Sequence, residues 1–238
     1  MKPNQRQDNE PHNQDTGIRL NKLRAAVLGA NDGIVSIAGL VVGVAGATNQ
    51  RSSIVTAGIA GVVAGAISMA AGEYVSVSSQ RDTEMALLRK EKYETDNFPK
   101  EELAELTQIY TDKGLTPKTA TVAAKELSQK DAYAAHIDAE LDINPKSLAN
   151  PWHAAIASAS AFLCGAALPI VAIAIPPAGS RIVITFISTL VALVITGALS
   201  ARFGRAPATR AILRVTAGGA LAMIVTYGIG RAIGATGL

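Results

Sequence analysis

Residues 53–94 decide the fold of this chain, and they read SIVTAGIAGVVAGAISMAAGEYVSVSSQRDTEMALLRKEKYE. Residues 54–72 carry no charge. About 19 residues of helix span roughly 28 Å, which is close to the hydrocarbon thickness of a bilayer. After Gly72 the chain continues without Pro or Gly through charged residues that favour helix. We therefore predict one helix that crosses a membrane and continues into water, linking an intramembrane site to an acidic site outside.

The composition indicates a membrane part joined to a polar part. Of the 238 residues, 49% are hydrophobic and 17% are charged, and most charges lie before residue 24 or between residues 81 and 146. The 21 glycines fit helices that pack closely in lipid. The single cysteine, Cys164, excludes a disulfide within the chain. A net charge of +3, carried by scattered basic residues, argues against nucleic-acid binding.

Four further apolar runs accompany the one at residues 54–72, so five transmembrane helices are expected. They cover residues 23–47, 154–179, 182–201 and 215–230. Lys and Arg are concentrated in the N-terminal tail, in the polar insert that follows the second run and in residues 201–214. With five spans these three segments fall on one side, which the positive-inside rule makes cytoplasmic, and the C-terminus lies outside.

The polar insert carries the start signals of short helices. Pro99 fits the first turn of an amphipathic helix over residues 100–112, and Pro117 starts another that runs to about residue 129. A further turn or two follows over residues 131–141. We predict an all-α membrane protein with a cytoplasmic three-helix insert between transmembrane helices 2 and 3. Its parts are a disordered cytoplasmic tail (1–21), transmembrane helices 1–2 (22–80), a metal-binding insert (81–150) and transmembrane helices 3–5 (151–238).

Asp32 is an acid inside the first apolar run. An isolated carboxylate there costs about 2.5–3.5 kcal/mol even on the lenient insertion scale. One interpretation is a cap of a broken helix near the interface, since Asn31 and Gly33 flank it; the other is a cation or proton site. Its position, about 12 Å into the span, favours the site.

Met69 and Glu73 lie four residues apart, on one face of the second transmembrane helix. A methionine in such a helix is usually a packing residue. Together with Asp32, however, the two residues offer two hard oxygens and one soft sulfur. That set suits a borderline transition ion such as Fe²⁺ better than Mg²⁺ or Ca²⁺.

Two pairs of glutamates three residues apart, Glu91 with Glu94 and Glu102 with Glu105, flank the break before Pro99. Carboxylates that converge repel one another unless a cation neutralises them. His136 and Glu140, spaced i and i+4, would complete a site of carboxylates and imidazole. The alternative is a solvated acidic face with lysines nearby, and spacing alone does not decide between the two.

Three strings identify a family resemblance: residues 57–84 (AGIAGVVAGAISMAAGEYVSVSSQRDTE), 29–36 (GANDGIVS) and 225–234 (VTYGIGRAIG). They resemble the vacuolar iron transporter family, including bacterial members, and the resemblance covers nearly all of the chain after the tail. It implies a five-span homodimer without a prosthetic group that exports Fe²⁺, and in some members Mn²⁺, from the cytosol in exchange for protons. It also implies that Asp32 and Met69 are ligands of the ion path between protomers, and that a capture site contains Glu91, Glu94, Glu102, Glu105 and Glu140.

The chain departs from the pattern of that family at two places. Plant members carry a glutamate where Gly61 stands here, which makes Glu73 the candidate to replace that carboxylate. They also carry methionines just before the last glutamate of the insert, where this chain has His136 and Ile137. The nodulin-like branch shares the GEYVS string of residues 72–76 but tends to lack the insert.

We therefore predict a proton-coupled exporter of Fe²⁺, with Mn²⁺ second, in a bacterial inner membrane. A membrane-anchored ferroxidase that uses the insert as a diiron site is the alternative from the enzyme class. Such sites usually show Glu-x-x-His on paired helices, whereas the insert has Glu-x-x-Glu twice and one histidine. A structural or metal-sensing membrane protein is the other alternative.

Overall fold

The computed structural model describes residues 15–145, 147–204 and 207–236, and these are helical or in connecting loops, with no strand among them. The chain divides into two compact units. Unit 1 comprises Met1–Glu73 and Trp152–Leu238, and unit 2 comprises Tyr74–Pro151. Unit 1 contains α1 (Asp15–Ala47), the first part of α2 (Arg51–Asn97), α5 (Pro151–Ala174), α6 (Arg181–Gly204) and α7 (Ala208–Thr236). Unit 2 contains the rest of α2, α3 (Pro99–Asp112), α4 (Pro117–His136) and the short π-helix η2 (Ile137–Leu141).

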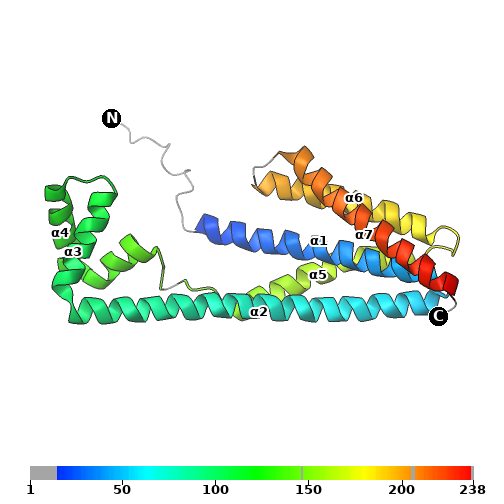
Figure 1. Cartoon of the computed structure of the whole chain (residues 1–238), viewed down its shortest axis with the longest axis horizontal. Coiled ribbons are helices and arrows are strands. Elements are labelled where there is room, and N and C mark those ends of the chain that lie inside the picture. Colours follow the sequence, from blue (N-terminus) through cyan, green and yellow to red (C-terminus); the bar gives the residue numbers. More distant parts are fainter. Residues whose placement is uncertain (1–14, 146, 205–206, 237–238) are drawn as a thin grey trace, which may run out of the picture. The chain divides into compact units, whose positions relative to one another are not determined.

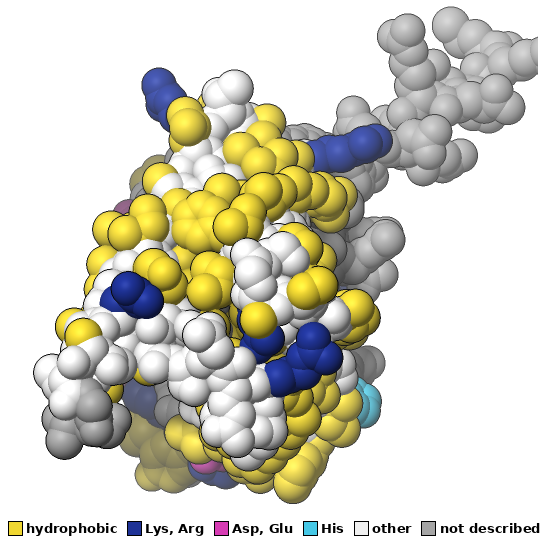
Figure 2. Space-filling view, turned by 90° about the vertical axis from the view of Figure 1, so that its right-hand side faces the viewer, with side chains coloured by type: hydrophobic (Ala, Val, Ile, Leu, Met, Phe, Trp, Pro, Cys, Tyr) yellow, Lys and Arg dark blue, Asp and Glu magenta, His cyan; other side chains and the backbone are white. Residues whose placement is uncertain are grey.

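Five helices in the described part of the chain are long and apolar enough to cross a membrane, which confirms the predicted number. They are Ala26–Ala47 within α1, Arg51–Asn97, Pro151–Ala174, Arg181–Arg202 and Ala208–Thr236. Helices satisfy their own backbone hydrogen bonds, as the hydrocarbon region requires. Figure 2 shows one end of unit 1, where hydrophobic side chains cover most of the visible surface and Lys and Arg side chains are scattered among them. Lys and Arg side chains at the ends of apolar helices are typical anchors at a membrane–water interface.

Two expectations for α1 change. The tail was expected to be disordered through residue 21; its residues 1–14 lie outside the described residues, and residues 15–21 are already helical. The Asn31-Asp32-Gly33 triplet, whose sequence favours a turn, lies inside the helix. Tertiary contacts explain this, because Thr196 Oγ1 donates a 2.5 Å hydrogen bond to Asn31 Oδ1 and a Cβ on Gly33 would strike the carbonyl oxygen of Phe162.

Close backbone approach holds the helices of unit 1 together. In Figure 1, α1 runs beside α6 and α7, and these three helices contact one another. At Gly165 a Cβ would collide with the backbone of Ala30, and at Gly230 it would collide with the carbonyl oxygen of Gly43. Side chains of α1, α2 and α5 form the largest buried cluster of unit 1, which consists of Ile37, Val41, Ala45, Ile54, Ala66, Phe162, Ala166 and Ile173. Small residues at the crossings therefore set how closely these helices pack.

The single long helix predicted from residues 53–94 is confirmed as α2, which supplies residues to both units. It ends at Asn97, and Pro99 occupies the first turn of α3, where its missing N–H costs nothing. Thr116 caps α4 by accepting a hydrogen bond from the Thr119 backbone N–H.

Asp131 breaks α4, with φ −165° and ψ 97°, and its Oδ1 accepts a hydrogen bond from the N–H of Ala134. This break matches the predicted boundary between a second and a third segment. Leu106, Ala124 and Ala135 form the buried core of unit 2, and α3 packs against α4 there. The break therefore starts a new turn that packs back on α3.

Gly230→Ala should lower the melting temperature of the purified protein in detergent. Its new methyl group would collide with the backbone of α1, and overpacking of this kind costs about 1–3 kcal/mol. Gly228→Ala is the matched control, because the structure places nothing within 4 Å of a Cβ there. Equal melting temperatures for the two variants would contradict this account of the packing.

Candidate metal centre

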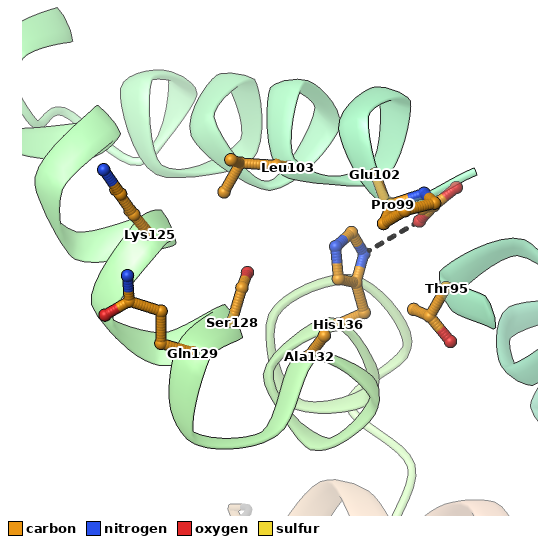
Figure 3. A pocket seen from close by; sticks show the side chains of 9 residues that line it. All are labelled: Thr95, Pro99, Glu102, Leu103, Lys125, Ser128, Gln129, Ala132 and His136. Atoms are coloured by element: carbon orange, nitrogen blue, oxygen red, sulfur yellow. Dashed lines mark ion pairs between the residues drawn. The ribbon is translucent and has the colours of Figure 1, made fainter. Parts of the chain in front are cut away.

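Three ionisable side chains from three helices converge inside unit 2. They are Glu91 of α2, Glu102 of α3 and His136 at the end of α4, and all three residues are buried. His136 Nδ1 lies 3.2 Å from Glu91 Oε1 and 3.3 Å from Glu102 Oε2. Figure 3 shows Glu102 and His136 facing one another beside Pro99 and Thr95. These three residues form the acid–histidine cluster.

Local signals in the sequence bring the three residues together. The chain reverses at Phe98 and Pro99, so α3 starts near the end of α2 and Glu102 lies in its first turn. The break at Asp131 redirects the last part of α4, which places His136 in the buried interior. Thr95 Oγ1 donates a 2.8 Å hydrogen bond to the carbonyl oxygen of Glu91. The cluster is therefore fixed by a turn, a break and the packing of α3 on α4.

Atoms of the cluster that could bind a cation are unsatisfied. Within the part of the chain that the structure describes, Glu91 Oε1 and both ring nitrogens of His136 are buried and make no hydrogen bond. One ligand atom from each residue can be chosen so that all lie within 4.8 Å of one another. Adjacent ligands of a six-coordinate ion, at about 2.1 Å from it, lie about 3 Å apart. Two carboxylates and one imidazole thus fit a divalent first-row transition ion.

The electrostatics of the cluster also require positive charge. Burial raises the pKa of Glu91 to about 7, and repulsion by Glu140, Glu102 and Glu94 adds to this rise. Burial also raises the pKa of Glu102, although His136 acts in the opposite direction. Both carboxylates lie outside the uncharged membrane segment of α2. Binding of a cation would compensate the burial of their charges.

The other glutamates predicted for the capture site lie at different distances from the cluster. Glu140 Oε2 lies 3.9 Å from His136 Nδ1, and its side chain is 32% exposed, so it stands at the rim. Glu94 forms an ion pair of 2.7 Å with Lys90. Glu105 is exposed. Their assignment as ligands stays a prediction.

A second group of predicted residues lines a pocket in unit 1. Asp32 and Met69 share this pocket of about 230 Å³, whose other walls are Ser36, Ile37, Leu40, Gly61, Gly65, Ser68 and Phe162. A Cβ at Gly61 would clash with Leu40, and one at Gly65 would clash with the ring of Phe162, so the two glycines let these side chains pack directly against α2. Asp32 is exposed in the single protomer. Glu73 is half-buried and is not among the lining residues.

Sequence reasoning missed the hydroxyls of this pocket and several polar residues near the cluster. Ser36 lies one turn after Asp32, and that i, i+4 spacing was the available signal. Ser128, Gln129 and Lys125 line a pocket beside His136. Their sequence reads as an ordinary polar helix face, so no pattern distinguished them.

Comparisons with known proteins show which family this chain resembles. The sequence profile of the VIT family matches residues 23–231. A vacuolar iron transporter of Acanthamoeba castellanii is 44% identical over 225 residues, which cover 94% of this chain and 82% of that protein. Vacuolar iron transporter homolog 2 of Arabidopsis thaliana is 36% identical and covers 94% of this chain and 90% of its own length. Vacuolar iron transporter homolog 5 of rice is also 36% identical, and the match covers 94% of this chain and 86% of the rice protein.

The raised pKa of Glu91 predicts how the stability of the metal-free protein depends on pH. Because the pKa rises from 4.5 to about 7, the folded protein binds more protons than the unfolded one in that range. The free energy of unfolding should therefore fall as pH rises from about 4.5 to about 7. In the presence of chelator, Glu91→Gln should melt near the parent protein at pH 5 and clearly above it at pH 8. The prediction would be contradicted if the difference in melting temperature between Glu91→Gln and the parent protein were the same at pH 5 and pH 8.

Proposed function

This chain belongs to the VIT family, and we propose that it carries Fe²⁺, and secondarily Mn²⁺, out of the cytosol across a membrane in exchange for protons. In this proposal unit 2 is cytosolic and captures the ion, and the pocket around Asp32 and Met69 is part of the path. The observation that carries the proposal is the acid–histidine cluster, in which Glu91 Oε1 and both His136 ring nitrogens are buried and make no hydrogen bond within the described residues. The relatives named as vacuolar iron transporters favour iron as the ion.

The ligand chemistry of the two sites fits a transported ion that is held and then released. In unit 2, hard carboxylate oxygens combined with a borderline imidazole nitrogen suit Fe²⁺ and Mn²⁺. In unit 1, the Met69 sulfur and the Asp32 carboxylate would favour Fe²⁺ over Mg²⁺ and Ca²⁺, which gain little from a thioether. A proton and a metal ion cannot both occupy the Asp32 carboxylate. Protons that enter from the outer side would thus displace the ion outward.

A homodimer is part of the proposal, and the exposure of Asp32 supports it. A carboxylate on a membrane helix costs several kcal/mol unless it faces protein or water. Asp32 is exposed on the single protomer, in a pocket that Gly61 and Gly65 also line. A second copy of the chain packed over this face would cover the carboxylate and close the wall of the path.

The membrane-anchored ferroxidase is the less favoured function. A diiron carboxylate site in a helical bundle uses two Glu-x-x-His motifs. Between residues 74 and 151 the sequence has one histidine, His136, and the cluster offers two carboxylates to it. That ligand set is sufficient for one ion.

Asp32→Ala should abolish Fe²⁺ flux into proteoliposomes that contain the purified protein, because the path loses its carboxylate. Asp32→Glu keeps a carboxylate at the same position and should retain part of the flux. The melting temperature of each variant reports whether it folds. Parent-like flux in a folded Asp32→Ala variant would exclude Asp32 from the mechanism.

Glu102→Gln and Glu105→Gln form a matched pair on α3, because one residue is buried in the cluster and the other is exposed. Glu102→Gln should weaken Mn²⁺ binding to the full-length protein in detergent by roughly a hundredfold, since it removes a ligand. Glu105→Gln should change the affinity little. Titration calorimetry measures both, and equal losses would point to a diffuse acidic surface instead of the buried cluster.

A further inference from the structure

Beside the acid–histidine cluster, unit 2 contains a pocket of about 300 Å³. Its walls come from the end of α2, α3 and α4, and the lining residues are Thr95, Pro99, Glu102, Leu103, Lys125, Ser128, Gln129, Ala132 and His136. A volume near 300 Å³ is at the lower end of the range for sites of small molecules. The volume is therefore sufficient for a small organic ligand next to the cluster.

Most polar side chains that line this pocket can donate a hydrogen bond, whereas the ionised Glu102 carboxylate only accepts. Lys125 supplies an ammonium group, Gln129 an amide and Ser128 a hydroxyl. Ser128 Oγ and His136 Nε2 are buried, and neither has a hydrogen-bond partner among the residues described. Buried polar groups of proteins are nearly always satisfied, so two orphans on one pocket indicate a missing partner.

The imidazole of His136 links this pocket to the metal cluster. Nδ1 faces Glu91 and Glu102, whereas the other ring nitrogen points toward the pocket in Figure 3. When Nδ1 of a neutral imidazole binds a metal ion, the proton resides on Nε2, which then donates a hydrogen bond. Metal-bound histidines almost always donate that proton to a carboxylate, a carbonyl or a water. The ligand of this pocket should therefore present an acceptor to His136.

The positions of the polar and apolar side chains around the pocket favour one kind of small ligand with hydrogen-bond acceptors. In Figure 3, Lys125 and Gln129 lie on the opposite side of the pocket from His136 and Glu102, with Leu103 and Ser128 between them. A molecule with acceptors at both ends and carbon atoms between them matches this distribution. A single compact oxyanion such as phosphate matches only one end.

We propose that this pocket binds a small dicarboxylate next to the captured metal ion, with one carboxylate at His136 Nε2 and Ser128 and the other at Lys125 and Gln129. The proposal rests on the capture of a divalent ion by unit 2. The nearer carboxylate accepts the Nε2 proton of the imidazole whose Nδ1 holds the ion, so the His136 ring connects the two binding sites. The carboxylate and the ion then stabilise each other's binding, and this coupling is reciprocal.

The test uses full-length protein in detergent, with Mn²⁺ as the ion and succinate, a weak chelator of Mn²⁺, as the dicarboxylate. Succinate should tighten Mn²⁺ binding by about tenfold, as expected for new hydrogen bonds to a charged group, and Mn²⁺ should tighten succinate binding by the same factor. Lys125→Ala should remove this coupling while Mn²⁺ affinity without succinate stays within about threefold of the parent value. Lys118→Ala, on the same helix but outside the pocket lining, should retain the coupling.

The outcomes separate this proposal from the proposed function. If Mn²⁺ binds to unit 2 and succinate has no effect on it, the dicarboxylate site is wrong and the capture site stands. If the coupling survives in Lys125→Ala, or if inorganic phosphate produces it equally well, the assignment to this pocket and ligand is overturned. If Mn²⁺ does not bind to the parent protein, capture by unit 2 fails and this proposal fails with it.

Discussion

The burial of two carboxylates beside one imidazole is the constraint on which unit 2 depends. Charges removed from water cost several kcal/mol each unless they are paired, and breaking such a pairing is strongly destabilising. Glu91, Glu102 and His136 lie within ion-pair distance, but Glu91 Oε1 and His136 Nδ1 have no hydrogen bond within the described residues. The small core around Leu106 supplies limited hydrophobic stabilisation. A divalent cation would satisfy all three side chains at once.

The membrane unit is held together by a different physical means. Its helices are hydrophobic on many sides, so burial of apolar surface does not select one arrangement in lipid. Close approach at Gly33, Gly165 and Gly230 and the hydrogen bond between Thr196 and Asn31 select it instead. Glycines also shape the pocket in which Asp32 and Met69 meet, because Leu40 and Phe162 pack directly against Gly61 and Gly65 at its walls. Glycines therefore determine both how the membrane helices pack and the shape of the candidate ion path.

Much of the architecture could be predicted because it rests on local patterns. The uncharged run of residues 54–72 and the charged run after it predicted α2, and Pro99, Pro117 and the polar break near residue 131 predicted the segments of unit 2. The Asn31-Asp32-Gly33 triplet, whose sequence is typical of a turn, is helical because α5 and α6 contact it there.

The geometry of the site was harder to predict. Spacing placed the glutamates in pairs three residues apart, but it did not determine that Glu102 is buried while Glu105 is exposed. That difference depends on how α3 packs against α4, which is a tertiary contact. Glu73 was expected beside Met69, whereas the pocket is lined by Ser36 and Ser68 in addition to Asp32 and Met69. Long-range packing decides these positions, and the sequence spacing carries no information about it.

The most direct test of the central claim is pulsed electron paramagnetic resonance of the full-length protein loaded with one equivalent of Mn²⁺. The account predicts nitrogen coupling from one imidazole, which disappears in His136→Gln while the protein remains folded. A Mn²⁺ spectrum without nitrogen coupling would contradict the claim that the buried carboxylates and His136 hold the ion together.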